Sequence, residues 1–225
     1  GDQVRSILKT KNLADTAYVN SHYVLLGTEQ GTIKKTSLAA YANPRTNGIH
    51  AIRINEGDRL LEAKLTQGDS HIVMALRSGR AIRFHEQDVR AMGRVAAGVR
   101  GVTLAGPDDR VVGIVSVHQA QADLLVVSEK GFGKRSALED YRTIKRGGKG
   151  VKTLSITEKT GALVAIKAVT DADELMIINK SGITIRISVA DLRIMGRATQ
   201  GVRLIRLNDS DEISSVAKIE QTLEE

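Results

Sequence analysis

The sequence repeats itself with a period of about fifty residues, and this repeat constrains the fold more than any other feature. Each unit opens with an apolar run that ends in a turn: YVLLGTEQG (23–31), IVMALRSG (72–79), LLVVSEKG (124–131) and LMIINKSG (175–182). The closing glycines, Gly31, Gly79, Gly131 and Gly182, lie 48, 52 and 51 residues apart. An apolar strand followed by such a turn predicts a β-hairpin whose glycine adopts a positive φ.

Each unit then continues in the same way. A second strand follows the turn, most clearly in GITIRIS (182–188), where apolar and polar residues alternate with a period of two. A polar loop ends in Gly48, Gly98, Gly150 or Gly201 and leads to a third apolar strand (IHAIRI, VRGVTL, VKTLSI or VRLIRL) and then a fourth. Four short strands per unit favour an all-β, propeller-like fold of about four four-stranded blades over an unrelated β-sandwich.

The repeat also predicts how the chain is divided within one domain. The opening residues GDQVRSIL match GDRLLEAK (57–64), so we expect the chain to begin with the last strand of a preceding blade, as a fragment of a longer protein would. The predicted boundaries are 1–18 for that strand and a connection, 19–70, 71–122, 123–173 and 174–219 for four blades, and 220–225 for an acidic tail.

The charge of the chain indicates the kind of partner. A formal net charge of +7 and a pI near 9.7 favour a polyanion. Aromatic residues make up only 3% of the chain, which argues against stacking of single-stranded bases and favours contacts to a duplex backbone. No apolar stretch of membrane-spanning length and no signal pattern occurs, so we expect a cytoplasmic protein without a membrane partner.

The polar loop before the third strand carries the most chemistry in each unit. Basic side chains and glycines recur there, and equivalent loops of a repeat protein emerge on one rim. Glycine allows the backbone to approach an anion, while arginine and lysine supply charge to phosphates without reading sequence. The predicted DNA contacts are Arg45, Arg94, Arg100, Arg142, Lys145, Arg146, Lys149, Lys152, Arg197 and Arg203. The predicted backbone-approach positions are Gly48, Gly98, Gly147, Gly148, Gly150 and Gly201.

These residues also have less specific interpretations. Any one loop alone is as well explained by a solvated turn, and IKRGGKG (144–150) lacks the spacing of a nucleotide-binding P-loop. The chain has no cysteine, and its five histidines lack metal-ligand spacing. No catalytic motif is found, so we expect no enzymatic activity, cofactor or metal site in this chain.

In order, the loops NPRTNG, MGRVAAG, IKRGGKG and MGRATQG and their flanking strands resemble successive blades of the C-terminal domain of the DNA gyrase A subunit. The resemblance covers nearly the whole chain. It implies a β-pinwheel, a propeller-like arrangement in which neighbouring blades exchange strands. That family has a signature box of the form Gln, basic, Arg, Gly, Gly, basic, Gly. Lys145 to Gly150 resembles a degenerate copy, with Ile144 in place of Gln, and we expect the box itself outside this chain.

The resemblance also implies a function. DNA would wrap around the outer rim and support negative supercoiling by the parent type II topoisomerase, a nucleoid-associated enzyme that uses ATP and Mg through other domains or subunits. The partners would be double-stranded DNA, the rest of the gyrase A subunit, and the gyrase B subunit. The alternatives are the C-terminal domain of the C subunit of topoisomerase IV and a propeller-type protein-interaction platform. The acidic tail (220–225) would be a frayed end or a competitor of DNA for the rim.

Overall fold

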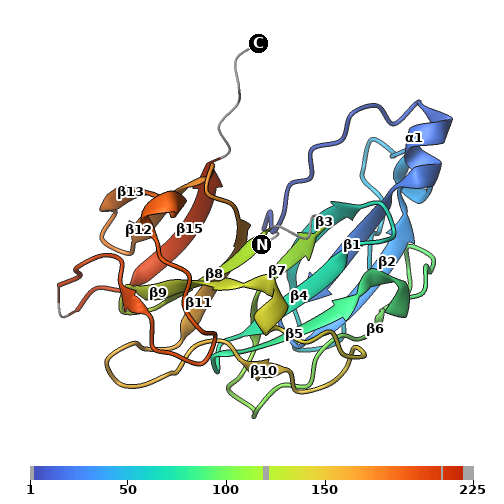
Figure 1. Cartoon of the computed structure of the whole chain (residues 1–225). Coiled ribbons are helices and arrows are strands. Elements are labelled where there is room, and N and C mark those ends of the chain that lie inside the picture. Colours follow the sequence, from blue (N-terminus) through green and yellow to red (C-terminus); the bar gives the residue numbers. More distant parts are fainter. Residues whose placement is uncertain (1–2, 119–121, 209, 220–225) are drawn as a thin grey trace.

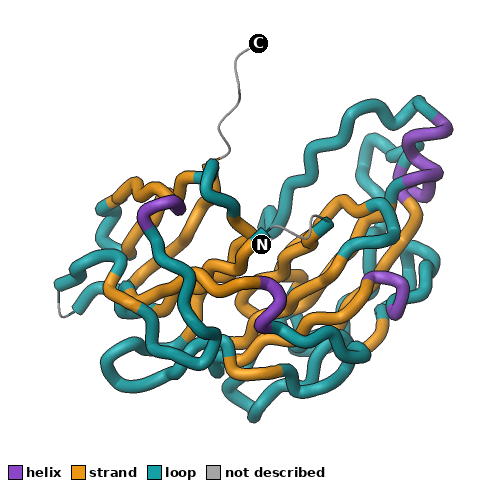
Figure 2. Tube along the Cα trace, in the orientation of Figure 1, coloured by secondary structure: helices purple, strands orange, loops and turns teal. Residues whose placement is uncertain are grey.

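The computed structural model describes residues 3–118, 122–208 and 210–219, and this part of the chain is built almost entirely of short antiparallel strands (Figure 2). One short helix, α1 (Thr16–Ser21), lies near the beginning, and the side chain of Asp15 caps it by accepting a hydrogen bond from Tyr18 N. One single-turn 3₁₀ helix follows the second strand of each hairpin. These helices are η1 (Leu38–Tyr41), η2 (Glu86–Asp88), η3 (Leu138–Asp140) and η4 (Val189–Asp191).

Four β-hairpins form where the repeat predicts them. The pairs are β1 (Tyr23–Thr28) with β2 (Thr32–Ser37), β4 (His71–Leu76) with β5 (Arg80–His85), β8 (Asp123–Ser128) with β9 (Phe132–Ala137), and β12 (Glu174–Asn179) with β13 (Thr184–Ser188). The turn glycines Gly31, Gly79, Gly131 and Gly182 have φ of 88°, 79°, 79° and 88°. The predicted positive φ is therefore confirmed at all four turns, where an L side chain would be strained.

The fourth strand of each unit pairs with the first strand of its own hairpin. These inner strands are β3 (Leu60–Thr66), β7 (Val111–Val117), β11 (Leu163–Val169) and β15 (Ile213–Ile219). Figure 1 shows the four sheets following one another in chain order along an arc from α1 to β13. The all-β, pinwheel-like architecture expected from the sequence is confirmed.

The third strands of the second, third and fourth units each complete the sheet of the preceding unit. β6 (Val99–Arg100) pairs with β2, β10 (Val151–Lys152) with β5, and β14 (Val202–Arg203) with β9. The sheet orders are β3-β1-β2-β6, β10-β5-β4-β7 and β11-β8-β9-β14, and the fourth sheet, β13-β12-β15, has three strands among the described residues. Neighbouring units thus exchange a strand.

These third strands are shorter than the sequence predicts, and no strand forms over 49–54. After two paired residues the chain turns inward across the preceding hairpin: Gly101 N and Thr153 N donate to the carbonyls of Gly31 and Gly79. Val102, Leu154 and Ile205, which follow, are 2%, 1% and 8% exposed. Burial of these apolar side chains ends the pairing, because a strand that continued along the sheet edge would leave them in water.

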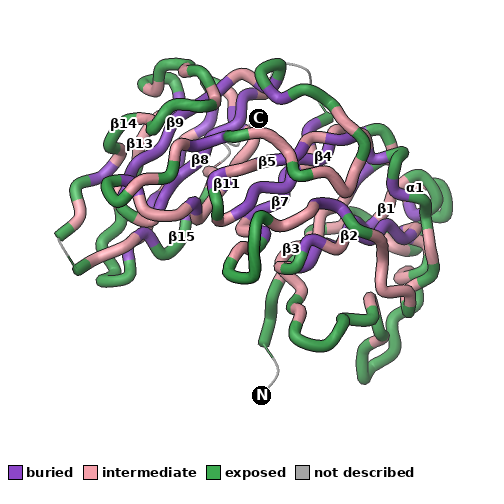
Figure 3. The backbone as a smooth tube through the Cα atoms, turned by 90° about the horizontal axis from the view of Figure 1, so that it is seen from below, coloured by how far each residue is buried: buried purple, intermediate pink, exposed green. Residues whose placement is uncertain are grey.

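The apolar core lies between successive sheets rather than in one central mass. On β4, Val73 and Ala75 pack toward β8, whereas Ile72, Met74 and Leu76 pack toward the first sheet. The third and fourth sheets enclose a further cluster that includes Leu125 and Ile177. Central strands buried on both faces need apolar residues at every position, which explains the continuous apolar runs in the sequence. Figure 3 shows this burial along the strands and the exposure of the connecting loops.

The described N-terminal residues, 3–15, contain no strand. They run beside β3, where Arg5 Nε donates to Leu60 O at 3.1 Å and Ala63 N donates to Ser6 Oγ at 3.1 Å. Leu8 and Leu13 pack on the outer face of the first sheet, together with Val19 of α1. The assignment of 1–18 to a preceding blade stays a prediction, and the predicted acidic tail lies outside the described residues.

Candidate nucleic-acid interface

Three equivalent loops form the candidate interface. We call residues 91–98, 143–150 and 194–201 the rim loops. Each begins with a parallel bridge to the second hairpin strand of the preceding unit: Ala91 to Lys35, Thr143 to Arg83 and Ile194 to Arg135. Each ends at the short exchanged strand, and Figure 1 shows β6 and β10 at the same, lower edge of the molecule. The register shared by the loops in the sequence therefore corresponds to a shared position in space.

The glycines that close the rim loops are required by packing against the preceding unit. Gly98, Gly150 and Gly201 have φ of 102°, 68° and 75°. A Cβ at these positions would collide with the carbonyl groups of Ile33, Ala81 and Gly133 respectively. Gly48, the equivalent residue of the first unit, has nothing within 4 Å of its would-be Cβ. A role for these glycines in approaching DNA stays a prediction, and the structure supplies a separate reason for their occurrence.

An arginine at one equivalent position links each rim loop to the unit before it. Arg146 Nε donates to Asp88 O at 2.9 Å, and its Nη1 donates to Arg100 O at 3.0 Å. Arg197 repeats this arrangement with Asp140 O at 3.0 Å and Lys152 O at 2.9 Å.

Arg94, the equivalent residue of the second unit, donates to His50 O at 3.2 Å. Arg45, Gly48 and Arg94 line a shallow hollow of about 480 Å³ between the first two loops. The linking arginines thus connect each rim loop to the unit before it.

The ten predicted contacts differ in how far their side chains are exposed. Exposed side chains in this set are Arg45, Arg100, Arg142, Lys145, Lys149, Lys152 and Arg203, and the half-buried ones are Arg94, Arg146 and Arg197. Among the described residues, none of these ten forms a salt bridge with a carboxylate. Elsewhere basic side chains are paired, as in Arg135 with Asp123 at 2.6 Å and Arg77 with Glu129 at 2.8 Å. Positive charge is therefore left uncompensated along the rim.

The Gly-Gly turn of the third unit is docked on its neighbour. Gly147 N donates to Gly101 O at 2.6 Å, and Thr103 donates from its N to Gly148 O at 3.0 Å and from its Oγ1 to Gly147 O at 2.7 Å. The N–H of Gly147 is thus already used within the protein. Lys145 and Lys149, on either side of the turn, remain exposed. In this loop the side chains, rather than that backbone group, offer positive charge to solvent.

Two buried lysines support the rim loops. The Nζ of Lys34 on β2 donates to the carbonyls of Ala51 and Arg94, and the Nζ of Lys134 on β9 donates to Gly196 O at 2.7 Å, Arg197 O and Thr199 O at 3.2 Å. These lysines are 0% and 1% exposed. Burial, helped by the charges of Arg94 and Arg197, lowers the pKa of both to about 8.

Sequence reasoning missed these two lysines because all their acceptors except Ala51 O are in the next unit. It also missed Arg80, which follows the hairpin turn. Arg80 donates to Lys149 O at 3.0 Å and Gly150 O at 2.7 Å. The signal that could have found the lysines is a charged residue at the third position after the hairpin glycine, inside an otherwise apolar strand.

The described residues show neither a cluster of metal-binding side chains nor a membrane-spanning helix. The described residues contain no group of three or more histidine, cysteine, aspartate or glutamate side chains that could hold a metal ion. In the same part of the chain, no helix has the length and apolar character needed to cross a membrane.

Strand-exchanged sheets around an arc, with a row of basic side chains that form no salt bridge within the described residues, define a propeller-like repeat protein with a basic rim. The family described as "DNA gyrase C-terminal domain, beta-propeller" matches the chain four times, over residues 22–67, 71–118, 122–170 and 173–220. The chain belongs to this family.

Relatives and solved structures agree with this placement. The chain is 40% identical to the DNA gyrase A subunit of Chlamydia pneumoniae over 220 residues, covering 97% of this chain and 26% of that protein. It is 42% identical to the DNA gyrase A subunit of Staphylococcus aureus (strain MRSA252) over 205 residues, covering 91% and 23%. The chain thus spans about a quarter of the length of these relatives.

Among solved structures, a DNA gyrase A C-terminal domain superposes with a TM-score of 0.82 at 28% identity, covering 95% of this chain and 69% of that one. The C-terminal domain of a DNA topoisomerase IV superposes with a TM-score of 0.84 at 24% identity, covering 89% and 62%. At that identity the second likeness concerns the fold alone.

Proposed function

We propose that this chain binds duplex DNA along the rim loops and bends it around the arc of sheets, without reading its sequence. The observation that carries the proposal is the row of ten basic side chains without carboxylate partners among the described residues. Such a row neutralises phosphates and releases condensed counterions, which supplies affinity that is independent of sequence.

The geometry also favours wrapping over binding at one point. The linking arginines and exchanged strands set a regular spacing between loops, so each unit adds contacts at the next stretch of the duplex. Bending a duplex by tens of degrees costs several kcal/mol in elastic estimates, ~1–6 for a site of 20–30 base pairs. Contacts spread over successive units offset this cost, which a single basic loop would not.

Within a longer protein related to the gyrase A subunit, the wrapped segment would be presented for strand passage, and supercoiling would depend on ATP, Mg and the gyrase B subunit. We expect the chain itself to act without a cofactor, in the cytoplasm and on the nucleoid.

Two measurements test the proposal. With about eight phosphates neutralised, the logarithm of duplex affinity should fall with the logarithm of salt concentration with a slope of roughly −7. Sealing a nicked plasmid in the presence of the protein should shift its linking number. Binding without a shift would refute wrapping, and no binding near physiological salt would leave the protein-interaction platform as the better interpretation.

Charge reversal supplies a matched control. Lys145→Glu combined with Lys149→Glu changes two exposed rim side chains and should weaken DNA binding at least tenfold. Lys9→Glu combined with Lys11→Glu changes the net charge equally, in the exposed segment before α1, which lies away from β6 and β10 (Figure 1). Equal losses from the two pairs would show that net charge, and not the rim, attracts DNA.

A further inference from the structure

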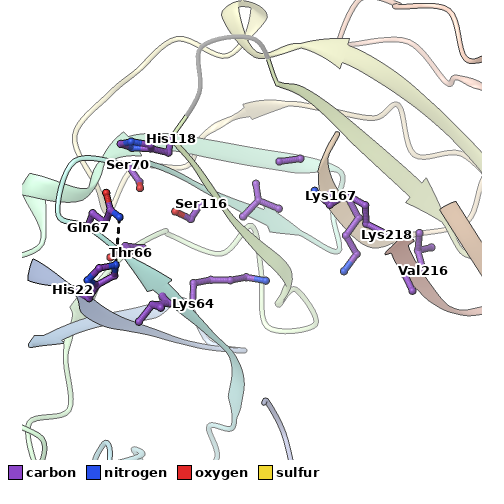
Figure 4. Close-up of a pocket in the computed structure, with 14 residues that line it drawn as sticks. His22, Lys64, Thr66, Gln67, Ser70, Ser116, His118, Lys167, Val216 and Lys218 are labelled. Atoms are coloured by element: carbon purple, nitrogen blue, oxygen red, sulfur yellow. Dashed lines mark hydrogen bonds between the residues drawn. The ribbon is translucent and has the colours of Figure 1, made fainter. Parts of the chain in front are cut away.

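A second basic region lies on the inner side of the arc, away from the rim loops. The inner strands of the four units lie next to one another there, and they border a hollow of about 750 Å³. Three lysines (Lys64, Lys167 and Lys218) and two histidines (His22 and His118) line this hollow. The acidic side chains nearest to them lie beside the lining, and one of these, Asp69, has its Oδ1 3.2 Å from His118 Nδ1. Figure 4 shows Lys64 on one side of the hollow, opposite Lys167 and Lys218.

The repeat explains why two of these lysines face the same space. Lys64 pairs in register with Leu25, Val115 with Val73, and Lys167 with Leu125. Lys64, Val115 and Lys167 are therefore equivalent residues of three successive inner strands, and all three line the hollow. Because Val115 is short and apolar, it leaves room between the two ammonium groups.

The charges in the hollow are only partly balanced. Lys64 Nζ lies 3.7 Å from Glu62 Oε2, an oxygen that also accepts a hydrogen bond from Ile114 N at 2.9 Å. Lys218 Nζ lies 3.8 Å from Asp173 Oδ2. Within the described ranges, no hydrogen bond or salt bridge is formed by Lys167 Nζ.

Burial lowers the pKa of Lys167; Glu62 acts in the opposite direction, and the charges of Lys64 and Lys218 lower it further. A group of like charges in a partly desolvated hollow is stabilised by a bound counter-anion.

We propose that this hollow is a binding site for a small, multivalent anion of the polyphosphate type, distinct from the duplex-binding rim. Its volume falls within the range of about 300–1,000 Å³ that is usual for small-molecule sites, and it is too small to admit a duplex. The ammonium groups of Lys64 and Lys167 hold opposite ends of the anion as point charges. Ser116, on the strand between them, also lines the hollow (Figure 4). Its hydroxyl would donate a hydrogen bond to the anion.

The experiment is calorimetric titration of inorganic tripolyphosphate into the whole chain, with the rim first saturated by a short duplex so that binding in the hollow is measured alone. One equivalent should bind. Lys64→Met and Lys167→Met should each weaken tripolyphosphate at least tenfold. Lys145→Met and Lys149→Met, on the rim, should leave it unchanged.

Several outcomes would overturn the site. One is an unchanged affinity for tripolyphosphate in the Lys64→Met, Lys167→Met double variant, and another is loss of tripolyphosphate binding in the rim variants. Tighter binding of citrate than of tripolyphosphate would exclude the phosphate class of ligand. The Lys167→Met variant should keep wild-type duplex affinity and should fold, since it removes a partly buried charge. Failure of this proposal is thus distinguishable from failure of DNA binding at the rim.

Discussion

The rim loops of the second and fourth units are held differently from that of the third. At the second and fourth, the ammonium groups of Lys34 and Lys134 enter the loop from the preceding sheet and donate to its carbonyls. At the third, Ile82 occupies the equivalent position and packs in an apolar cluster with Ile144. The same backbone position is thus fixed in two loops by hydrogen bonds to a buried charge and in the third by apolar contact.

This difference teaches how the loop sequences are constrained. The lysine-supported loops read Met-Gly-Arg, whereas the isoleucine-supported loop reads Ile-Lys-Arg-Gly-Gly. A would-be Cβ at Gly148 would lie 3.2 Å from Ile144 Cδ1 and 3.6 Å from Ile82 Cδ1. The richest basic sequence in the protein therefore occurs where the support is apolar and places no second charge beneath the loop.

The largest expected effect on stability comes from placing a lysine under the third-unit loop, which is supported by an apolar side chain. Ile82→Lys puts an ammonium group among apolar side chains at the third loop, where Ile82 is fully buried. We expect a loss of about 4 kcal/mol in the free energy of unfolding, measured by urea denaturation. Ile82→Met, a change of similar size without charge, should cost less than about 1.5 kcal/mol. Equal costs would show that the two kinds of support are interchangeable.

Removing the charged support should have the next largest effect. Lys134→Met leaves the carbonyls of Gly196, Arg197 and Thr199 without their buried donor, and we expect a loss of about 3 kcal/mol in the free energy of unfolding. Amide exchange in 194–201 should accelerate, while that in 143–150 should not change. A uniform acceleration across both loops would contradict the local support described for Lys134.

The pH dependence of the unfolding free energy should also distinguish the charged support, Lys134, from the apolar support, Ile82. The folded pKa of Lys134 is about 8 and that of an unfolded lysine is 10.5, so the unfolded state binds more protons between these values. Stability contributed by this group therefore rises as pH increases from 8 to 10.5 and is lost as pH falls from 10.5 to 8. The difference in unfolding free energy between wild type and Lys134→Met should widen over that window. The corresponding difference for Ile82→Met should stay constant. If neither difference changes with pH, a link between protonation of Lys134 and stability is excluded.

The linking arginines should give the smallest effect on stability. Arg197→Gln loses the donors to Asp140 O and Lys152 O and should cost about 1 kcal/mol, because exposed hydrogen bonds contribute little. Duplex affinity should fall severalfold, since a charge and the loop spacing are both lost. Arg197→Lys keeps the charge without the two-point contact. If it restores full wrapping in the linking-number assay, the spacing role is excluded.

Much of this fold follows from the sequence. The two sets of regularly spaced glycines, the hairpins and the position of the inner strands are local features. Each is set by a run of apolar residues and a turn. The rim loops were also predictable as a set, because equivalent residues of a repeat occupy equivalent places. The exposed members, such as Lys145 and Arg203, need no partner to be recognised.

What escaped prediction depends on contacts between units. Arg146 and Arg197 are as basic as their neighbours in the sequence, and only the structure shows that their guanidinium groups bind carbonyls of the preceding unit. Gly98 looks like a turn residue but is required by the nearness of Ile33 O. The third strands pair over fewer residues than their apolar content predicts, because Val102, Leu154 and Ile205 are buried over the hairpin turn instead of continuing along the sheet edge.

The pairing of β2 with β6 has a consequence for how pieces of this protein can be made and how it folds as it is synthesised. Thr32 meets Arg100 and Ile33 meets Val99, so the first sheet stays incomplete until the second unit has left the ribosome. A piece cut at residue 70 would expose the β2 edge and invite aggregation, whereas one extended through residue 105 would carry the chain that covers it. The foldable length of this protein is therefore one repeat plus about two-thirds of the next.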